Sequence, residues 1–192
     1  MIAIVKYNAG NIRSVQNALS RLGYDSVITD DPAELKAAEK VIFPGVGEAN
    51  SAMRYLKEKG LDEVIKSLEQ PVLGICLGLQ LMCISSEEGN TDCLGIFPNK
   101  VLRFQGNVII PHMGWNDFIS TNGPLFSGIK TEDDVYFVHS YYAELGAYTA
   151  AICDYIEPFS AAISKDNFYA TQFHPEKSSE VGTLILKNFL EL

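Results

Sequence analysis

The chain has 192 residues, of which 47% are hydrophobic and 20% charged, and it carries a formal net charge of −9 at pH 7. Such a composition is typical of a globular protein whose core needs no disulfide or metal. Because phosphate backbones repel acidic chains, we expect no nucleic-acid binding. The apolar run at residues 2–5 is too short for a signal peptide or a membrane span, so we expect a cytoplasmic protein with reduced thiols.

The first half of the chain alternates predicted strands and helices. Apolar or β-branched runs predict strands at 2–5, 26–29, 41–43 and 71–75, and helical spacing predicts helices at 12–22, 52–59, 61–68 and 77–84. Asn11 is a predicted helix N-cap and Gly23 a predicted helix end. Asp31 and Glu34 are predicted to form a capping box that opens another helix. This alternation predicts βαβ units, and hence a mostly parallel sheet with helices on both faces.

From about Cys93 onward the pattern changes to short β-rich segments separated by turns. Predicted strands cover 100–104, 108–111, 135–138, 149–153 and 168–172, and a final helix covers 180–190. We therefore expect a smaller antiparallel β part in the second half. Because the chain has no repeat, low-complexity segment or linker, residues 1–192 are predicted to form a single domain.

The main chemical signal is Cys76, at the centre of Gly74-Ile75-Cys76-Leu77-Gly78. A nucleophile on a sharp strand-to-helix turn needs small residues on both sides, because the backbone there is strained. The turn would present the thiol at the carboxyl edge of the sheet, where the following helix N-terminus would stabilise the thiolate. The alternative is a buried structural cysteine between two glycines, and the flanking strand and helix favour the nucleophile.

A thiolate that attacks an amide also needs a general acid for the departing nitrogen, usually histidine. Of the three histidines, His174 follows the predicted strand 168–172, and Pro175 restricts its backbone. Glu176 is placed to orient the ring, which would complete a Cys-His-carboxylate arrangement. The alternative for His174 is a surface histidine in a turn. His112 and His139 have aromatic or apolar neighbours and are predicted to be structural.

Gly45-Val46-Gly47 directly follows the predicted strand 41–43. Backbone N–H groups of this turn, together with the N–H of Leu77, would form an oxyanion hole, although an ordinary tight turn is the alternative. No Gly-Lys-Ser/Thr follows, so the turn is not a phosphate-binding loop. The four cysteines form no CxxC pair and no zinc-type spacing, and we expect no metal or other cofactor.

These segments together resemble the class I, triad-type glutamine amidotransferases, and within that class the family of glutaminase subunits of imidazole glycerol phosphate synthase. The resemblance runs nearly end to end and is carried by residues 10–15, 44–47, 74–80, 111–116, 136–141 and 172–176. It implies a flavodoxin-like three-layer α/β sandwich and a catalytic triad of Cys76, His174 and Glu176.

The resemblance also implies roles for residues without a signal of their own. Glutamine would be held near Gly47, Gln80, Glu88, Ser140 and Tyr141. Glu88 would bind the ammonium group of the substrate, although Glu87-Glu88 alone is typical of a solvated charge pair. One departure is Lys6, where many members of the family carry an acidic residue. This departure concerns the first loop rather than the triad.

The same resemblance implies a partner, a (βα)8-barrel cyclase that the family meets at Asn11, Trp115, Tyr136 and Lys177. Glutamine would be hydrolysed to glutamate, and the ammonia would cross into the barrel. The products there would be imidazole glycerol phosphate and an aminoimidazole carboxamide ribotide, in histidine biosynthesis.

Three other functions are compatible with parts of the pattern. A glutaminase that serves another synthase, such as pyridoxal phosphate synthase, is disfavoured by residues 44–47 and 112–116. A non-catalytic scaffold role is disfavoured because Cys76, His174 and Glu176 are all present. A hydrolase of a different ester or amide is the weakest alternative.

Overall fold

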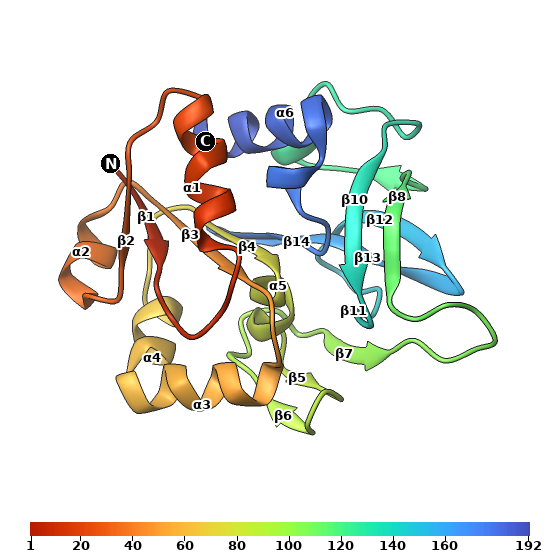
Figure 1. Ribbon diagram of the computed structural model, residues 1–192, viewed down its shortest axis with the longest axis horizontal. Helices are drawn as coiled ribbons and strands as arrows, with labels where there is room; N and C mark the ends of the chain where they lie inside the picture. The colour runs from red at the N-terminus through yellow and green to blue at the C-terminus, as the bar shows by residue number, and fades with distance from the viewer.

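The computed structural model describes all 192 residues. Its centre is a run of five parallel strands in the order β2-β1-β3-β4-β14 (Figure 1). These strands are β1 (Ile2–Val5), β2 (Ser26–Thr29), β3 (Lys40–Gly45), β4 (Val72–Cys76) and β14 (Phe168–Thr171). The last of them comes from the end of the chain, so it joins a sheet that the first half has started.

Helices cover both faces of this sheet, as the alternating pattern predicted (Figure 1). They are α1 (Ile12–Arg21), α2 (Pro32–Ala37), α3 (Ala49–Lys59), α4 (Leu61–Lys66), α5 (Leu77–Met82) and α6 (Ser179–Leu190). Helices α1 and α6 pack on one face and α2 to α5 on the other. Along β1, Ile2 and Ile4 join the core under α1 and α6, while Ala3 and Val5 join the core under α2 to α5. This is the two-residue alternation of a strand buried on both sides.

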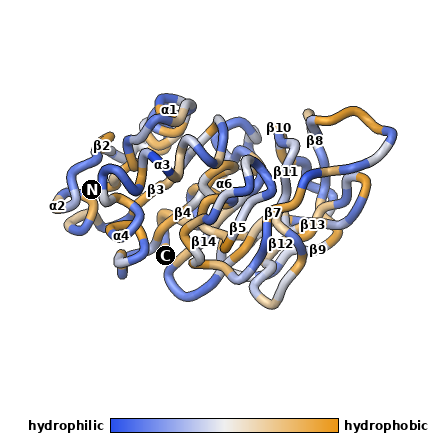
Figure 2. The backbone as a smooth tube through the Cα atoms, turned by 90° about the horizontal axis from the view of Figure 1, so that it is seen from below, coloured by the Kyte–Doolittle hydropathy of each residue, from blue (hydrophilic) through white to orange (hydrophobic).

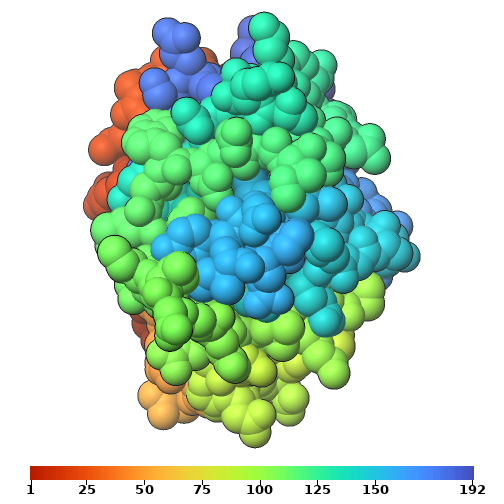
Figure 3. Space-filling view, turned by 90° about the vertical axis from the view of Figure 1, so that its right-hand side faces the viewer, coloured from red at the N-terminus to blue at the C-terminus, as the bar shows by residue number.

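The second half extends this sheet with antiparallel strands and covers one side of the molecule (Figure 3). Next to β14 lies β13 (Glu157–Lys165), which pairs with both β12 (Thr149–Tyr155) and β11 (Tyr141–Ala143). The smaller strands are β5 (Ser85–Ser86), β6 (Thr91–Asp92), β7 (Lys100–Arg103) and β9 (Ser120–Thr121). A separate antiparallel pair is formed by β8 (His112–Asn116) and β10 (Val135–His139), and the 3-10 turns are η1 (Pro124–Phe126) and η2 (Pro175–Lys177).

The predicted fold class is confirmed, but in the second half one predicted strand is wrong and one long strand was not predicted. Residues 108–111 form no strand; they belong to a loop between β7 and β8 in which Ile109 is 82% exposed. Figure 2 shows this hydrophobic loop projecting from the body of the molecule. Conversely, β13 was not predicted, because Pro158, Ser160 and two alanines give it little intrinsic β-propensity, and its burial between neighbouring strands decides its conformation.

Helix termini explain two further differences. Asp31 accepts hydrogen bonds from the N–H groups of Ala33 and Glu34, at 2.7 and 3.1 Å, so it caps α2 as predicted. The other half of the capping box is absent, because the Asp31 N–H donates to Thr29 Oγ1 instead. Asn11 precedes α1 as predicted but makes no side-chain cap, and its φ is +71°.

No helix in the structure combines the length and the apolar run that crossing a membrane requires.

Candidate active site

Cys76 lies at the junction of β4 and α5 with a strained backbone, φ +54° and ψ −104°. The flanking glycines make this turn possible. A Cβ on Gly78 would lie 1.9 Å from the carbonyl oxygen of Phe43, and one on Gly74 would lie 2.9 Å from Met82 Sδ. The predicted strand-to-helix elbow is therefore present, with the thiol at the carboxyl end of β4, although α5 ends at Met82 rather than Ile84.

The sheet register brings the three segments that carry the predicted site residues to the carboxyl edge of the parallel strands. Gly45 at the end of β3 pairs with Cys76, and Thr171 of β14 pairs with Ile75 on the other side. Parallel strands end at the same edge, so the turn after β3, the thiol and the segment after β14 meet there. His174 follows β14 by three residues and so reaches the site from this edge.

His174 and Glu176 form a buried pair: Nδ1 of the ring lies 2.8 Å from Glu176 Oε1, and both side chains are 0% exposed. The other ring nitrogen, Nε2, has no conventional hydrogen-bond partner and is left for Cys76. Burial disfavours the charged ring, but the Cys76 sulfur and the Glu176 carboxylate together outweigh it and raise the pKa of His174 to about 10. This arrangement favours the imidazolium form of His174.

The backbone of His174 is fixed on both sides. Its N–H donates to the carbonyl of Tyr136 in β10 at 2.9 Å, and the Ser178 hydroxyl donates to its carbonyl at 2.7 Å. The same hydroxyl accepts the Tyr136 N–H at 2.9 Å, so one buried serine joins β10 to η2. The Asn11 amide donates to Glu176 Oε1, which holds the carboxylate in turn. The ring therefore has little freedom to turn away from the sulfur.

A pocket of about 320 Å3 opens directly beside the thiol. It is lined by Val46, Gly47, Cys76, Leu77, Gln80, Glu88, Pro111, Val138, His139, Ser140 and Tyr141. The structure thus brings together every residue expected to hold glutamine or its oxyanion except Gly45, which is buried and does not line the pocket. Residues 111, 138 and 139 were not predicted to line it; they follow from the neighbouring strands β8 and β10, whose pairing the sequence pattern did not establish.

The 45–47 turn is held by contacts from the first loop. Tyr7 donates its hydroxyl to the carbonyl of Pro44 at 2.7 Å, and a Cβ on Gly45 would lie only 2.0 Å from that hydroxyl oxygen. The Gly10 N–H donates to the carbonyl of Val46 at 3.3 Å. Gly47 has φ +134°, a conformation that side chains rarely adopt, so a glycine is required where the turn meets the pocket.

Glu88 lines the same pocket and has a dual environment. One of its oxygens, Oε2, accepts the N–H of Ala49 at 2.8 Å and so caps α3 from a distance in sequence. Burial raises the pKa of this carboxyl above its usual value, opposed by the Ala49 hydrogen bond and aided by Glu48. Its other oxygen is not engaged by this hydrogen bond and is available to a cation in the pocket.

His112 and His139 are buried and joined by a hydrogen bond of 2.9 Å between Nδ1 and Nε2. His139 Nδ1 must donate to the carbonyl of Tyr141, at 2.8 Å, which leaves its Nε2 to accept from His112. Burial lowers the pKa of His112 to about 4 and that of His139 to about 3. Both are thus neutral packing residues, stacked or tilted against Phe137, but His139 additionally lines the pocket.

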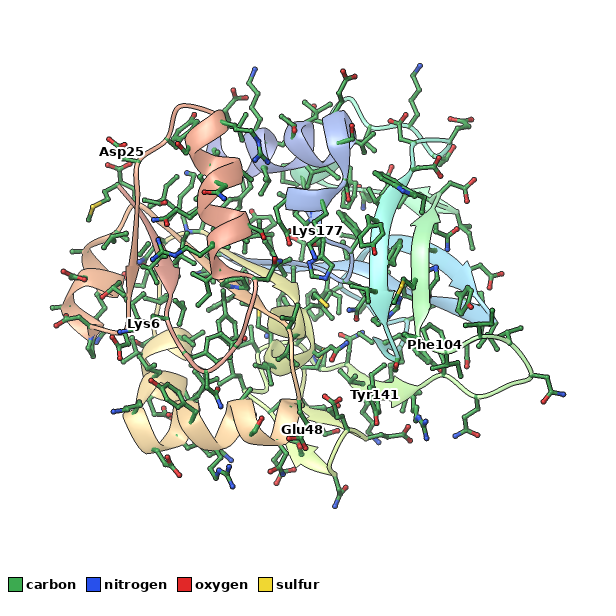
Figure 4. All side chains as sticks on the ribbon, in the orientation of Figure 1. Lys6, Asp25, Glu48, Phe104, Tyr141 and Lys177 are labelled. Atoms are coloured by element: carbon green, nitrogen blue, oxygen red, sulfur yellow. The ribbon has the colours of Figure 1, made fainter.

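The four candidate partner-facing residues separate into two groups. Trp115 is 54% exposed and meets the half-buried ring of Tyr136 edge-on, with centroids 5.9 Å apart. Lys177 is exposed on η2, between α1 and the β8–β10 pair in Figure 4. Asn11 differs, because its side chain points inward to Glu176. Lys6, the departure in the first loop, is exposed and lies 3.7 Å from Asp30.

A family model for the class I glutamine amidotransferases matches residues 4–192. The chain therefore belongs to the class I glutamine amidotransferase family, as its motifs predicted. Within that family it groups with the HisH subunits of imidazole glycerol phosphate synthase. It is 62% identical to the HisH subunit of Bacteroides fragilis and 60% identical to that of Bacteroides thetaiotaomicron, each over 194 residues that cover 100% of this chain and 99% of the relative.

Solved structures agree on the fold. The PurLQS structure from Thermotoga maritima superposes with a TM-score of 0.70 at 18% identity, covering 99% of this chain and 97% of that one. The glutaminase domain of Trypanosoma brucei CTPS, with bound acivicin, gives a TM-score of 0.65 at 16% identity, covering 99% and 97%. At these identities the likeness concerns the fold alone.

Proposed function

We propose that the whole chain is one amidotransferase domain that hydrolyses glutamine to glutamate and ammonia through a thioester on Cys76. The observation that carries the proposal is a strained thiol that lines one pocket with Val46 and Gly47, while the buried His174–Glu176 pair leaves a ring nitrogen for the same thiol. Gln80, Glu88, Ser140 and Tyr141 surround the remaining volume, where they would hold the substrate.

In the first half-reaction the Cys76 thiolate attacks the side-chain amide carbon of glutamine. The carbonyl electrons move onto oxygen, where backbone N–H groups of the 45–47 turn and Leu77 stabilise the oxyanion. As the intermediate collapses, the C–N bond breaks and the His174 imidazolium gives its proton to the departing nitrogen. Ammonia leaves and a glutamyl thioester remains.

In the second half-reaction water attacks the thioester carbonyl. Neutral His174 takes the proton from that water, and Glu176 stabilises the resulting imidazolium through Nδ1. The C–S bond then breaks, glutamate is released and the Cys76 thiolate returns. His174 therefore acts as acid and then as base.

The ammonia has a further destination in this proposal, a cyclase partner. The curated relatives are subunits of imidazole glycerol phosphate synthase, and their high identity over full length supports the same assembly here. The exposed Trp115, with Tyr136 and Lys177 nearby, offers the docking surface. The barrel partner would use the ammonia to form imidazole glycerol phosphate and the aminoimidazole carboxamide ribotide in the cytoplasm.

The decisive experiment measures ammonia and glutamate release from glutamine by the chain, with and without the cyclase and its nucleotide ligand. Cys76→Ala should lower turnover by at least about a thousandfold, because no other group can form the thioester. The matched control is Cys83→Ala, since Cys83 is buried within the core and does not line the pocket.

Glutamine turnover that survives in Cys76→Ala would refute the thioester proposal. A wild-type chain that binds the cyclase but is never labelled at Cys76 by a glutamine-analogue alkylator would instead identify a scaffold role.

A further inference from the structure

Cys76 Sγ has a second polar neighbour that lies outside the substrate pocket. The side-chain nitrogen of Gln172 is 3.7 Å from the sulfur, and Gln172 is completely buried. Because Gln172 is not among the residues that line the pocket, it approaches the sulfur from the core and not from the side of the substrate. A buried amide in this position needs a partner for each of its polar ends.

The surrounding hydrogen bonds fix which end of the Gln172 amide faces the sulfur. The Gln80 side-chain nitrogen donates to the carbonyl of Tyr141 at 3.0 Å, and a backbone carbonyl only accepts. The same nitrogen lies 3.1 Å from the Gln172 side-chain oxygen, so it donates there with its second hydrogen. The Gln172 NH2 group is thereby directed at Cys76 Sγ.

The network continues into the buried histidine pair, of which His139 also lines the pocket. His139 Nδ1 donates to the same Tyr141 carbonyl at 2.8 Å, and His112 donates to His139. Every donor in this hydrogen-bond network has an acceptor. The orientation of the Gln172 amide is therefore set by side chains and a carbonyl on β8, β10, β11 and α5. An amide held from one end by several elements is preorganised toward the other.

A second group near the sulfur is the carbonyl of Val138, 3.9 Å away, which can only accept a hydrogen bond. That carbonyl accepts the S–H of a neutral thiol but offers nothing to a thiolate. Gln172 does the reverse, since its N–H groups are strengthened by a charged acceptor.

From this geometry we propose that Gln172 is a further residue of the catalytic centre, whose amide donates a hydrogen bond to the Cys76 thiolate and holds the sulfur in its attacking position. The inference rests on the proposed function, since it assigns Gln172 a part in the same reaction. It predicts an effect in both half-reactions: Gln172 stabilises the thiolate before attack, and stabilises it again as the leaving group when the thioester is hydrolysed.

The test is the rate of Cys76 alkylation by iodoacetamide as a function of pH, followed by mass spectrometry in the full-length chain. Gln172→Met removes the donor and keeps the side-chain length, and the pH midpoint of alkylation should rise by about one unit, as expected for loss of a charge-assisted hydrogen bond. Glutamine turnover in the cyclase complex should fall about tenfold in kcat with little change in KM, because Gln172 does not line the pocket.

Gln172→Glu is the second variant and guards against simple misfolding. It preserves the oxygen that accepts from Gln80 and puts a carboxyl group in place of the NH2 donor, so the midpoint should rise more than in Gln172→Met, because a carboxyl group beside the sulfur adds repulsion to the loss of the donor. Ser160→Ala is the matched control. Ser160 lies in β13, is also 0% exposed, and donates its hydroxyl to the carbonyl of Glu144. Its midpoint should equal that of the wild type.

A wild-type midpoint in Gln172→Met, with thermal unfolding showing that this variant is folded, would overturn the inference, even if Gln172→Glu is shifted. This outcome is distinct from failure of the proposed function, in which the wild-type complex itself releases no ammonia from glutamine.

Discussion

His174 is held between a sulfur and a carboxylate, with no exposed surface through which water could screen it. The pair is short, at 2.8 Å, and the carboxylate is itself held by Asn11. In a buried site, electrostatic interactions are stronger than in water, so the charge state of His174 depends on these neighbours more than on the solution. The protonated ring is therefore a built-in property of the resting site.

Replacing Glu176 with glutamine should lower the pKa of His174, because Gln keeps the acceptor for Nδ1–H but removes the negative charge. The pKa of His174 is raised from its ordinary 6.5 to about 10, so its proton contributes stability that is fully present below pH 6.5 and lost as pH rises through 10. The gap in thermal midpoint between wild type and Glu176→Gln should thus be largest near pH 6.5 and narrow toward pH 10.

The matched control for that experiment is Glu180→Gln, an exposed glutamate in the first turn of α6. It removes the same charge without touching the ring. NMR titration of His174 gives an independent check, and an unshifted ring in Glu176→Gln would show that the carboxylate does not set its protonation.

At the scale of elements, α5 packs directly against the backbone of β3 beside the site. Gly78 in the first turn of α5 leaves no room for a side chain against the Phe43 carbonyl, so the helix lies almost on the strand. This approach places the N-terminus of α5 under the thiol and lets the 45–47 turn reach the same pocket. The packing of one helix on one strand therefore sets the geometry of the oxyanion site.

Gly78→Ala should destabilise the protein by about 3 kcal/mol or more, because the new Cβ forces α5 away from β3. Glutamine turnover should fall in the fraction that still folds. Gly23→Ala is the matched control, since Gly23 has φ +83° with no atom within 4 Å of the new Cβ, and it should cost only about 1 kcal/mol. Urea denaturation measures the free energy of unfolding. An equal decrease in the two variants would show that the contact of α5 with β3 is not what makes Gly78 necessary.

A helix or strand was predictable from the sequence where signals within the segment itself are enough to fix its conformation. The parallel strands and the helices of the first half follow from apolar runs and caps that are local in sequence. β13 was missed because its Pro, Ser and Ala residues become a strand only when β12 and β14 flank it. The run at 108–111 has the residues of a strand but no partner to pair with, and so remains a loop.

The candidate site shows the same division. Cys76, His174 and Glu176 lie in short motifs, so the sequence alone predicted that they act together, and their catalytic roles stay a prediction. Gln172 was not predicted. It directly follows β14, and strand-like alternation is the only signal that relates it to His174, two residues on; its contact with the sulfur depends on Gln80 and Tyr141 from distant segments. Asn11 was predicted to face the partner, and only the folded chain shows it bonded to Glu176.

At the scale of the whole molecule, exposed apolar side chains gather in the segment from residue 108 to residue 119, which we call the apolar strip. It consists of Val108, Ile109, Met113, Trp115 and Ile119. This segment includes the projecting loop and β8, whose partner β10 holds the backbone of His174 through Tyr136 and Ser178 (Figure 1). A protein docked on this strip would therefore contact β8, whose neighbour β10 bonds directly to the segment that carries His174.

Trp115→Ala should weaken binding of the cyclase at least about tenfold, since exposed tryptophans at interface centres dominate affinity. Isothermal titration calorimetry measures the loss, and iodoacetamide labelling of Cys76 in the isolated chain should stay at the wild-type rate. Leu145→Ala is the matched control, because Leu145 is also exposed, at 46%, but lies outside the strip. Wild-type affinity in Trp115→Ala would place the partner on another face.

The position of β14 between β4 and β13 has a consequence for the protein during its own synthesis. Gln172 lies 96 residues after Cys76, so at about 5 to 20 residues per second the ribosome makes the thiol roughly 5 to 20 s before its buried partners exist. Until then the parallel sheet ends at β4, and the nascent thiol has neither a general acid nor a closed pocket. On the proposed mechanism, a growing chain cannot hydrolyse glutamine before His174 and Glu176 have been made, so consumption of this nutrient waits for the last part of the chain.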